Sequence, residues 1–140
     1  MVLKSLSFIS FNCTGFKLRN YDYLKCLYNN SQVLFIQETW LFNSQHKNIN
    51  NLFKGCQYHA VSAMADDDVG RVGRPYGGCA IVWHGDLALS CRPVPTTSKR
   101  VCAVTAEAPG RAMLWLTVYM PVNDNTNTSY NNYGEVLAEV

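Results

Sequence analysis

The chain has 140 residues, of which 48% are hydrophobic and 16% are charged. Disordered chains combine low hydrophobicity with high net charge, so this composition excludes disorder and fits one folded domain with a core. The formal net charge of +2 is too small to indicate a nucleic acid or an acidic membrane as a partner by itself. No apolar run is long enough to cross a bilayer, and we expect no membrane association.

The first third of the chain predicts a strand, a helix and a second strand. Apolar residues alternate with serines over residues 3–11, which is typical of a half-buried strand. Asn20 can cap a helix that ends at Asn29 and Asn30, and the run "VLFI" that follows is typical of a strand buried on both faces. Strand, helix and strand within about 37 residues match a βαβ unit, so we predict that the two strands are parallel neighbours.

A carboxylate stands where the second strand ends. Glu38 follows the buried run in "VLFIQETWL", although a carboxylate removed from water is costly unless it is paired or bound to a metal. Asn12 ends the first strand in the same way. If the two strands are parallel, Asn12 and Glu38 emerge at one edge of the sheet, where ligands gather in such folds. Glu38 could instead be a solvated turn residue, and Asn12 could form an Asx turn.

The second half of the chain is rich in strand patterns. A strand could occupy residues 57–64, and the glycine-rich segment at residues 65–78 predicts an exposed loop. The four runs that follow, "CAIVWH", "LALSCRPV", "KRVCAVTAEA" and "AMLWLTVY", predict an antiparallel meander with tight turns at Gly85-Asp86 and Pro109-Gly110. Tyr119 ends the last run, either as a third polar group at a strand end or as a core aromatic with a surface hydroxyl.

The last ten residues predict an amphipathic helix. Tyr133, Val136, Leu137 and Val140 have helical spacing, and no cap or breaker follows them. We therefore expect the sequence to be part of a larger domain.

The remaining chemistry-bearing residues predict neither a metal cluster nor a disulfide framework. The six cysteines are scattered without a Cys-x-x-Cys motif, and without an export signal we expect reduced thiols in an intracellular (nuclear or cytoplasmic), not secreted, protein. The aspartate triplet at residues 66–68 lacks the spacing of a calcium loop. The three histidines have no ligand-like spacing.

Four segments, in the order "SFISFNCTGF", "VLFIQETWL", "GRPYGGCAIVW" and "LWLTVYMPVN", resemble the amino-terminal half of the endonuclease/exonuclease/phosphatase superfamily. They are most similar to the apurinic-endonuclease-like domain of non-LTR (LINE-type) retrotransposons, and the resemblance spans nearly the whole chain. It implies an α/β (α+β) fold, an incomplete four-layer α/β sandwich with a mixed, largely antiparallel sheet and flanking helices. Residues 1–140 would be the amino-terminal portion of a single such domain, truncated at the carboxyl end.

The resemblance implies phosphodiester hydrolysis that depends on Mg²⁺ or Mn²⁺, as in a DNA-nicking endonuclease of a retrotransposon. Glu38 would bind the divalent cation, and a single carboxylate suffices here because Mg²⁺ keeps several waters. Asn12 would hydrogen-bond the scissile phosphate, and Tyr119 would offer its hydroxyl to the phosphate or the leaving oxygen. Asn123 and Arg74 are candidates for substrate binding. The loop that carries Arg74 could bind DNA phosphates or could simply be exposed to solvent.

The family's carboxyl-terminal half supplies an Asp-x-Asn pair, a further Asp and a terminal Ser-Asp-His with the general base, and none of these occurs here. We therefore expect this chain alone to be inactive or nearly so. Its partners would be the DNA phosphate backbone, the missing carboxyl-terminal half and a downstream reverse transcriptase. We also expect the incomplete domain to expose apolar surface at Trp83, Trp115 and Leu116.

Two other functions fit the residues. The first is a phosphatase or phosphodiesterase of the same superfamily that acts on lipids or small phosphates. The second is a non-catalytic β-rich binding domain in which Asn12, Glu38 and Tyr119 are ordinary surface residues. In that second case, the three side chains would point apart in the structure.

Overall fold

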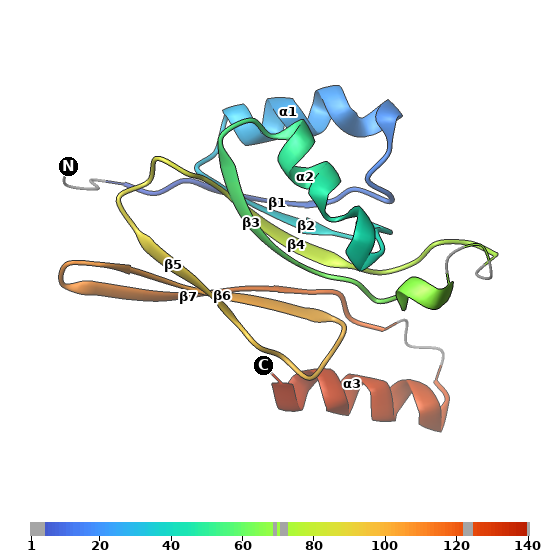
Figure 1. Cartoon of the computed structure of the whole chain (residues 1–140). Helices are drawn as coiled ribbons and strands as arrows, with labels where there is room; N and C mark the ends of the chain where they lie inside the picture. Colours follow the sequence, from blue (N-terminus) through green and yellow to red (C-terminus); the bar gives the residue numbers. More distant parts are fainter. Residues whose placement is uncertain (1–4, 69, 71–72, 122–124, 140) are drawn as a thin grey trace.

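The computed structural model describes residues 5–68, 70, 73–121 and 125–139. Two β-sheets lie face to face, with two helices on the outer face of the first sheet and a third helix beyond the second (Figure 1). This order of layers is that of a four-layer α/β sandwich. The predicted fold class is confirmed.

The first part of the chain contains β1 (Phe8–Asn12), α1 (Tyr21–Asn29), β2 (Val33–Gln37), α2 (Lys47–Leu52) and β3 (Cys56–Val61). The second part contains β4 (Cys79–His84), β5 (Ser90–Val94), β6 (Val101–Ala108), β7 (Arg111–Val118) and α3 (Asn127–Glu139). Short 3₁₀ helices occupy Leu18–Asn20, Asn43–Gln45 and Asp66–Asp68.

The first sheet has the strand order β1-β2-β4-β3. β1 and β2 are parallel, with Asn12 opposite Gln37 at their carboxyl ends, and α1 lies in the connection between them. The predicted βαβ unit is therefore confirmed. β4 is antiparallel to both β2 and β3, so the sheet is mixed and largely antiparallel.

The second sheet contains β5, β6 and β7, all antiparallel, and the predicted turn at Pro109-Gly110 joins β6 to β7. The prediction that β4 belongs to the same meander is wrong. β4 pairs with β2 and β3, and Gly85-Asp86 forms a turn on the path from one sheet to the other. Burial gives the reason: Cys79 to Trp83 are all buried, as a strand covered on both faces requires.

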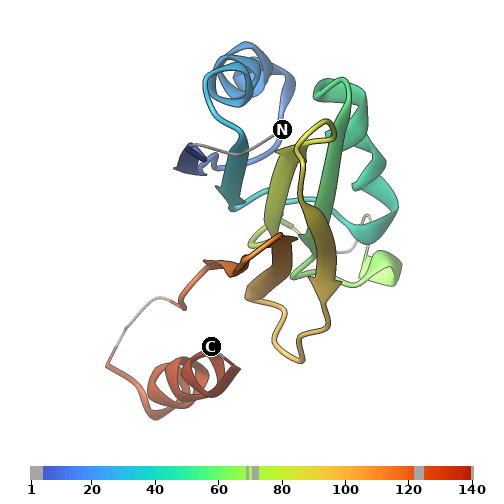
Figure 2. The same ribbon diagram turned by 90° about the vertical axis from the view of Figure 1, so that its left-hand side faces the viewer.

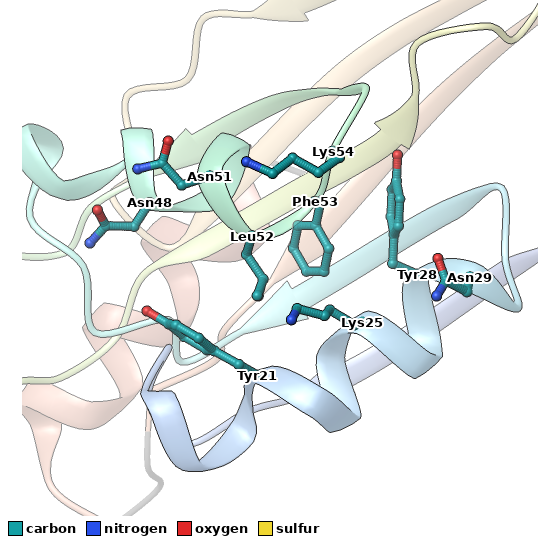
Figure 3. A pocket seen from close by; sticks show the side chains of 9 residues that line it. All are labelled: Tyr21, Lys25, Tyr28, Asn29, Asn48, Asn51, Leu52, Phe53 and Lys54. Atoms are coloured by element: carbon teal, nitrogen blue, oxygen red, sulfur yellow. The ribbon is translucent and has the colours of Figure 1, made fainter.

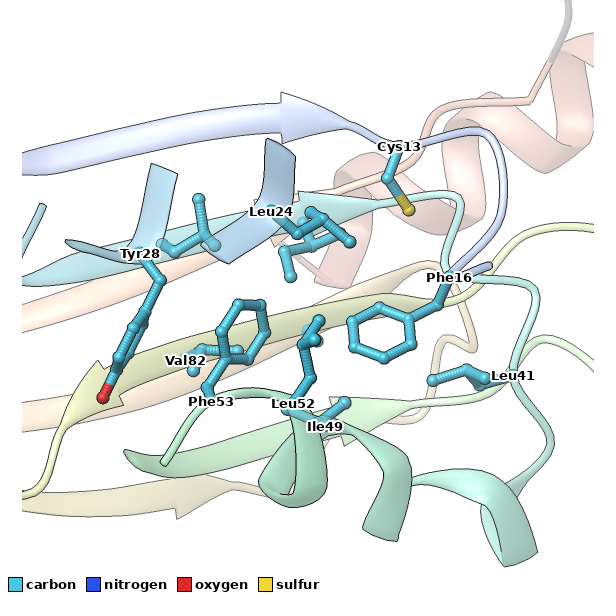
Figure 4. Packing of buried hydrophobic residues seen from close by; sticks show 12 residues of the cluster. Cys13, Phe16, Leu24, Tyr28, Leu41, Ile49, Leu52, Phe53 and Val82 are labelled. Carbon is cyan, nitrogen blue, oxygen red and sulfur yellow. The ribbon is translucent and has the colours of Figure 1, made fainter. Parts of the chain in front are cut away.

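Two hydrophobic clusters lie on opposite faces of the first sheet, and they explain why β2 and β4 are apolar at successive positions. Leu34 and Ile36 of β2 belong to one cluster with Ala80 and Val82 of β4. Figure 4 shows Val82 facing side chains from α1 and α2, such as Leu24 and Leu52. The alternate positions of both strands pack against the second sheet. Because successive side chains of a strand point to opposite faces, a strand covered on both faces needs apolar residues throughout.

Asn20 precedes α1 but does not cap it, so this prediction is wrong. Its side chain makes no capping bond, because the residue has helical dihedral angles (φ −98°, ψ −8°) and ends a 3₁₀ helix. The Nδ2 group donates instead to the backbone carbonyls of Cys13 at 2.9 Å and Gly15 at 2.8 Å. Asn20 therefore ties the start of α1 to the loop that follows β1.

β1 and β7 are outermost strands of their sheets, and they lie on the same side of the molecule (Figure 2). Phe8 of β1 is 47% exposed and Leu114 of β7 is 58% exposed. The prediction of exposed tryptophans is wrong: Trp83 and Trp115 are each 4% exposed, because their rings pack together between the sheets with centroids 6.1 Å apart. Leu116 is half-buried.

α3 begins earlier than predicted and is attached near its carboxyl end. Val136 is buried, as its helical spacing predicts, whereas Leu137 is 65% exposed. The Glu139 carboxylate accepts hydrogen bonds from the backbone N–H and the hydroxyl of Thr97, in the loop between β5 and β6. The side chain of Tyr133 and all of Val140 lie outside the described residues.

All six cysteines carry free thiols. Among the residues that the structure describes, no helix has the length and apolarity that crossing a bilayer requires.

Candidate active site at the carboxyl ends of the strands

Asn12 and Glu38 emerge at the same edge of the first sheet, as the parallel pairing predicts. Asn12 lies opposite Gln37, and Glu38 follows directly. The Asn12 side chain is exposed, and its Oδ1 accepts a hydrogen bond of 3.1 Å from the backbone N–H of Thr14. Asn12 thus forms the Asx turn that was one of its two interpretations. The turn uses the carbonyl oxygen of the amide and places the residue at the site edge.

Glu38 lies in a backbone segment with an unusual conformation. Its φ angle is +54°, and Trp40 has a φ angle of +58°, in the left-handed region that non-glycine residues rarely adopt. Hydrogen bonds hold this segment from two sides. The backbone carbonyl of Glu38 accepts a hydrogen bond of 2.8 Å from the N–H of Gly15. The N–H of Trp40 donates to the carbonyl of Gly77 at 2.9 Å. Such strained residues persist only where the surroundings fix them, and they cluster at functional sites.

Gly78 completes this support because a larger residue would not fit. Its φ angle is +86°, and a Cβ atom there would lie 2.4 Å from the Oγ1 of Thr39. The Gly78 carbonyl accepts a hydrogen bond of 3.1 Å from the N–H of Thr39, which is buried. The Gly-Gly pair before β4 therefore allows the close backbone contact that positions Glu38.

Tyr119 follows β7 and reaches the same edge from the second sheet. Its backbone N–H donates to the carbonyl of Arg100 at 2.9 Å, and its side chain lines a hollow together with Glu38. Partial burial raises the pKa of Tyr119 above 10.0, and the nearby Glu38 carboxylate raises it further. The Arg100 guanidinium, 5.5 Å from the centroid of the Tyr119 ring, acts in the opposite direction. Tyr119 is therefore a neutral hydroxyl at neutral pH.

Two adjoining hollows share Tyr119 in their walls. The larger, of about 450 Å³, lies between the sheets and is lined by Asn12, Gln37 and Thr117, among others. The smaller, of about 230 Å³, is lined by Glu38 and by residues of the loop before β4. The structure thus brings Asn12, Glu38 and Tyr119 to one edge, and the three side chains do not point to separate parts of the molecule.

Of the two predicted substrate-binding residues, one reaches this edge. Arg74 lines the smaller hollow together with Glu38 and Tyr119. Asn123 lies outside the described residues.

A hydrogen bond links the two sheets behind the site. The Nε2 group of Gln37 donates to the Oγ1 of Thr117 at 2.7 Å, and Thr117 is buried. The bond fixes the end of β2 against the end of β7. It therefore sets the relative position of the two segments that carry Glu38 and Tyr119.

Sequence reasoning did not identify Arg100, Trp40 or Thr117 as parts of this edge. Arg100 could have been found, because a two-residue turn at Pro109-Gly110 sets the register of β6 and β7 and places Arg100 opposite Tyr119. No local signal marks Thr117, because its contact with Gln37 spans two sheets.

Another hollow, of about 700 Å³, lies between α1 and α2 (Figure 3). Its lining is rich in asparagine and contains Lys25 and Lys54. None of Asn12, Glu38, Arg74 and Tyr119 lines it.

The donor set at the edge fits Mg²⁺ or Mn²⁺ better than a softer metal. Within the described ranges, no group of three or more His, Cys, Asp or Glu side chains could hold a metal ion. Glu38 is one carboxylate, half-buried and open to the smaller hollow. Mg²⁺ needs only one or two carboxylates, because waters and substrate oxygens complete its shell. The oxygen donors present are therefore compatible with this cation.

The fold is shared with solved nuclease and phosphatase structures. The AP endonuclease LMAP from Leishmania major matches with a TM-score of 0.66 at 17% identity, over 91% of this chain and 44% of that one. The endonuclease domain of TRAS1, a telomere-specific non-LTR retrotransposon, matches with a TM-score of 0.59 at 16% identity, over 94% and 53%. The 3′ phosphatase NExo from Neisseria, bound to product DNA hairpin, matches with a TM-score of 0.59 at 15% identity, over 96% and 49%.

The chain has the endonuclease/exonuclease/phosphatase fold. The likeness is one of structure, because no family model matches the sequence and no curated protein matches it. The chain spans about half the length of these solved structures with the endonuclease/exonuclease/phosphatase fold.

Proposed function

We propose that this edge binds a divalent cation at Glu38 and hydrolyses phosphodiester bonds of DNA. The observation that supports it best is that Glu38 and Tyr119 line one hollow. Two segments from different sheets place a carboxylate and a neutral hydroxyl in its wall, with Asn12 at the same edge. This arrangement argues against the non-catalytic binding domain, which predicts that the three side chains point apart.

Each residue has a role that its chemistry allows. Glu38 would hold Mg²⁺ or Mn²⁺, and such a cation would stabilise negative charge on the phosphoryl oxygens. Tyr119, with its raised pKa, stays protonated and can donate a hydrogen bond to a phosphate or leaving oxygen. Asn12 keeps its amide N–H donors for a phosphate oxygen, since its Oδ1 is the atom used in the turn.

Cations around the two hollows support DNA as the substrate. Arg74 lines the smaller hollow, and Arg100 lies over the Tyr119 ring. Such side chains bind backbone phosphates without reading sequence. NExo, which shares the fold, has been solved with a DNA hairpin, and LMAP is an AP endonuclease. We further propose an intracellular location, nuclear or cytoplasmic, where DNA is available and thiols stay reduced.

We infer that the 140 residues form the amino-terminal portion of a longer catalytic domain. The chain spans about half of the matched structures, and β1 and β7 each have an outer edge that pairs with no described strand. None of the three histidines lines either hollow, and His84 is stacked on Tyr28 at the far end of β4. The general base would therefore come from the second half, and the chain alone would be inactive or nearly so.

The likeness to TRAS1 supports the finer proposal of a retrotransposon endonuclease. We propose with it, from the sequence resemblance alone, a downstream reverse transcriptase. A 3′ phosphatase is the second candidate, because NExo carries that name and has the same fold. The site residues suit both reactions, because each requires a cation and hydrogen-bond donors at a phosphoryl group.

The test is nicking of supercoiled plasmid by a longer chain that includes the second half. We expect nicking with Mg²⁺ or Mn²⁺, none with EDTA, and a loss of at least about 100-fold in Glu38→Gln. Glu107→Gln is the matched control. It removes the same negative charge, but at an exposed residue of β6 that lines neither hollow. Equal nicking by Glu38→Gln and Glu107→Gln would remove Glu38 from the mechanism. Release of phosphate from a 3′-phosphorylated oligonucleotide without nicking would favour the phosphatase.

A further inference from the structure

A second group of side chains gathers around Trp40, next to the proposed cleavage site. The Nζ atom of Lys17 lies 4.4 Å from the centroid of the Trp40 ring, and the guanidinium carbon of Arg74 lies 5.4 Å from it. Both distances are within the range of cation–π contacts. Tyr76 is 51% exposed and lines the same small hollow as Trp40 and Glu38. Trp40, Tyr76 and Arg74 thus share the hollow of Glu38, and Lys17 contacts the Trp40 ring.

The backbone holds Trp40 in a fixed position. Its φ angle is +58°, and its N–H donates to the carbonyl of Gly77 at 2.9 Å. Gly15 packs directly against the ring, since a Cβ atom at Gly15 would lie 2.6 Å from the Cε3 atom of Trp40. A bulky residue in the left-handed region is unfavourable and is typical of ligand-binding segments. The ring is therefore positioned before any ligand arrives.

We propose that Trp40 and Tyr76 stack with an unpaired nucleobase next to the cleaved phosphate, while Lys17 and Arg74 bind the adjoining backbone phosphate. The chain then prefers single-stranded or locally unpaired DNA to a closed duplex. This inference rests on the proposed function, because it specifies the form of the DNA that the same edge binds.

The combination of groups carries the argument. Aromatic platforms with interleaved cations are how proteins bind single strands, because every base has a stacking face and every nucleotide has a phosphate. A base within a closed duplex has both faces covered by its neighbours and cannot stack on a protein ring. A base that stacks on Trp40 takes the place of Lys17 or Arg74 on the ring, and the displaced side chain can then donate its N–H groups to a phosphate oxygen.

The size of the hollow agrees with a single base. Its volume is about 230 Å³. Sites for drug-sized ligands have volumes of roughly 300–1,000 Å³. The hollow therefore has room for one ring system or one phosphate.

Fluorescence of the 140-residue chain tests this inference. Trp83 and Trp115 are buried, so Trp40 is the tryptophan whose emission a ligand can change. We expect a short oligothymidylate, added in EDTA, to quench this emission, and the duplex with oligoadenylate to bind more weakly. Trp40→Leu should weaken binding of a labelled oligothymidylate by about 5- to 100-fold, the range for losing one stacking contact, while Trp40→Tyr should retain most of it.

The two cations are tested by the salt dependence of binding. Lys17→Gln and Arg74→Gln should each weaken binding and reduce the slope of log K against log salt by about 0.7, the value for one phosphate contact on a single strand. Both side chains are exposed, so these variants should fold even where Trp40→Leu does not. Lys25→Gln is the matched control, because Lys25 lines the hollow between α1 and α2. It should bind as the unaltered chain does.

Three results would overturn the inference: no quenching, duplex binding as tight as single-strand binding, or an equal loss in Lys25→Gln and Lys17→Gln. The assay contains no divalent cation and measures no cleavage. Equal nicking by Glu38→Gln and Glu107→Gln would therefore count against the proposed cleavage mechanism but not against this single-strand preference. An absence of oligothymidylate binding would leave the roles of Asn12, Glu38 and Tyr119 in cleavage untouched.

Discussion

At the scale of single residues, the site depends on Glu38 being held in a conformation that its own side chain disfavours. Its φ angle of +54° costs of order 1–2 kcal/mol for a residue with a Cβ atom. Hydrogen bonds from the loop after β1 and from the Gly-Gly pair before β4 hold the surrounding segment. The result is a carboxylate that lines the same hollow as Tyr119.

The pairing of Glu38 with Tyr119 predicts a pKa change. In Glu38→Gln, the pKa of Tyr119 should fall toward 10.0, because the negative charge that opposes ionisation is gone. It should stay above 10.0, since burial is the largest cause of the shift. Titration of ¹³Cζ-labelled tyrosine followed by NMR measures this pKa, with Glu107→Gln as control. An unchanged pKa of Tyr119 in Glu38→Gln would show that the two side chains are not in contact.

At the scale of elements, the segment that carries Glu38 is held at a junction of three connections: the loop after β1, the segment after β2 and the loop before β4. The first two were predictable, because a βαβ unit is local in sequence and parallel strands end at one edge. The third was not, because β4 was assigned to the wrong sheet. Sheet membership depends on pairing between segments that are distant in sequence. The apolar pattern that begins at Cys79 is equally compatible with pairing to β2 and with pairing to β5.

Gly78 tests how much this junction depends on close backbone contact. Gly78→Ala should lower the free energy of unfolding by about 2–4 kcal/mol, because it combines a positive φ angle with overlap against Thr39. Gly110→Ala is the matched control, with a φ angle of +74° and no atom within 4 Å, and should cost about 1 kcal/mol. Urea unfolding gives both values. Equal losses would mean that the segment around Glu38 yields to accommodate the methyl group.

At the scale of the whole molecule, the family resemblance predicts the layers correctly, but the expected exposed surface is wrong. Trp83 and Trp115 were expected at the surface because the domain was judged incomplete. They are buried because the two sheets already cover each other, and the exposed apolar side chains on β1 and β7 include Phe8 and Leu114. Sequence alone could not predict which apolar side chains are exposed, because pairing between distant strands decides which strands lie at the sheet edges.

The open edges predict self-association of the 140-residue chain. Leu114 is 58% exposed on the outermost strand β7, and an uncovered apolar strand is a site for pairing with another chain. Leu114→Lys should shift the chain toward the monomer in analytical ultracentrifugation. Leu18→Lys, at a residue that is 83% exposed but lies in a 3₁₀ helix, should have little effect. A chain that is monomeric at all concentrations would contradict the prediction.

Buried thiols predict a loss of stability at alkaline pH. Burial raises the pKa of Cys79 and of Cys102 to about 12, from 9.0. Above pH 9 the unfolded chain releases these protons while the folded chain retains them, so unfolding releases protons and the free energy of unfolding falls as the pH rises toward 12. Urea unfolding between pH 8 and about 10.5 should show this decline, with a shallower slope in Cys79→Ala. A flat profile in the unaltered chain would contradict it.

The most direct test of the central claim is where Mn²⁺ binds, measured by paramagnetic broadening in the NMR spectrum of the 140-residue chain. We expect Mn²⁺ to broaden the amide signals of Asn12, Glu38 and Tyr119, EDTA to restore them, and Glu38→Gln to abolish the effect. Broadening that persists in Glu38→Gln, or that is confined to Asp66–Asp68, would contradict the account.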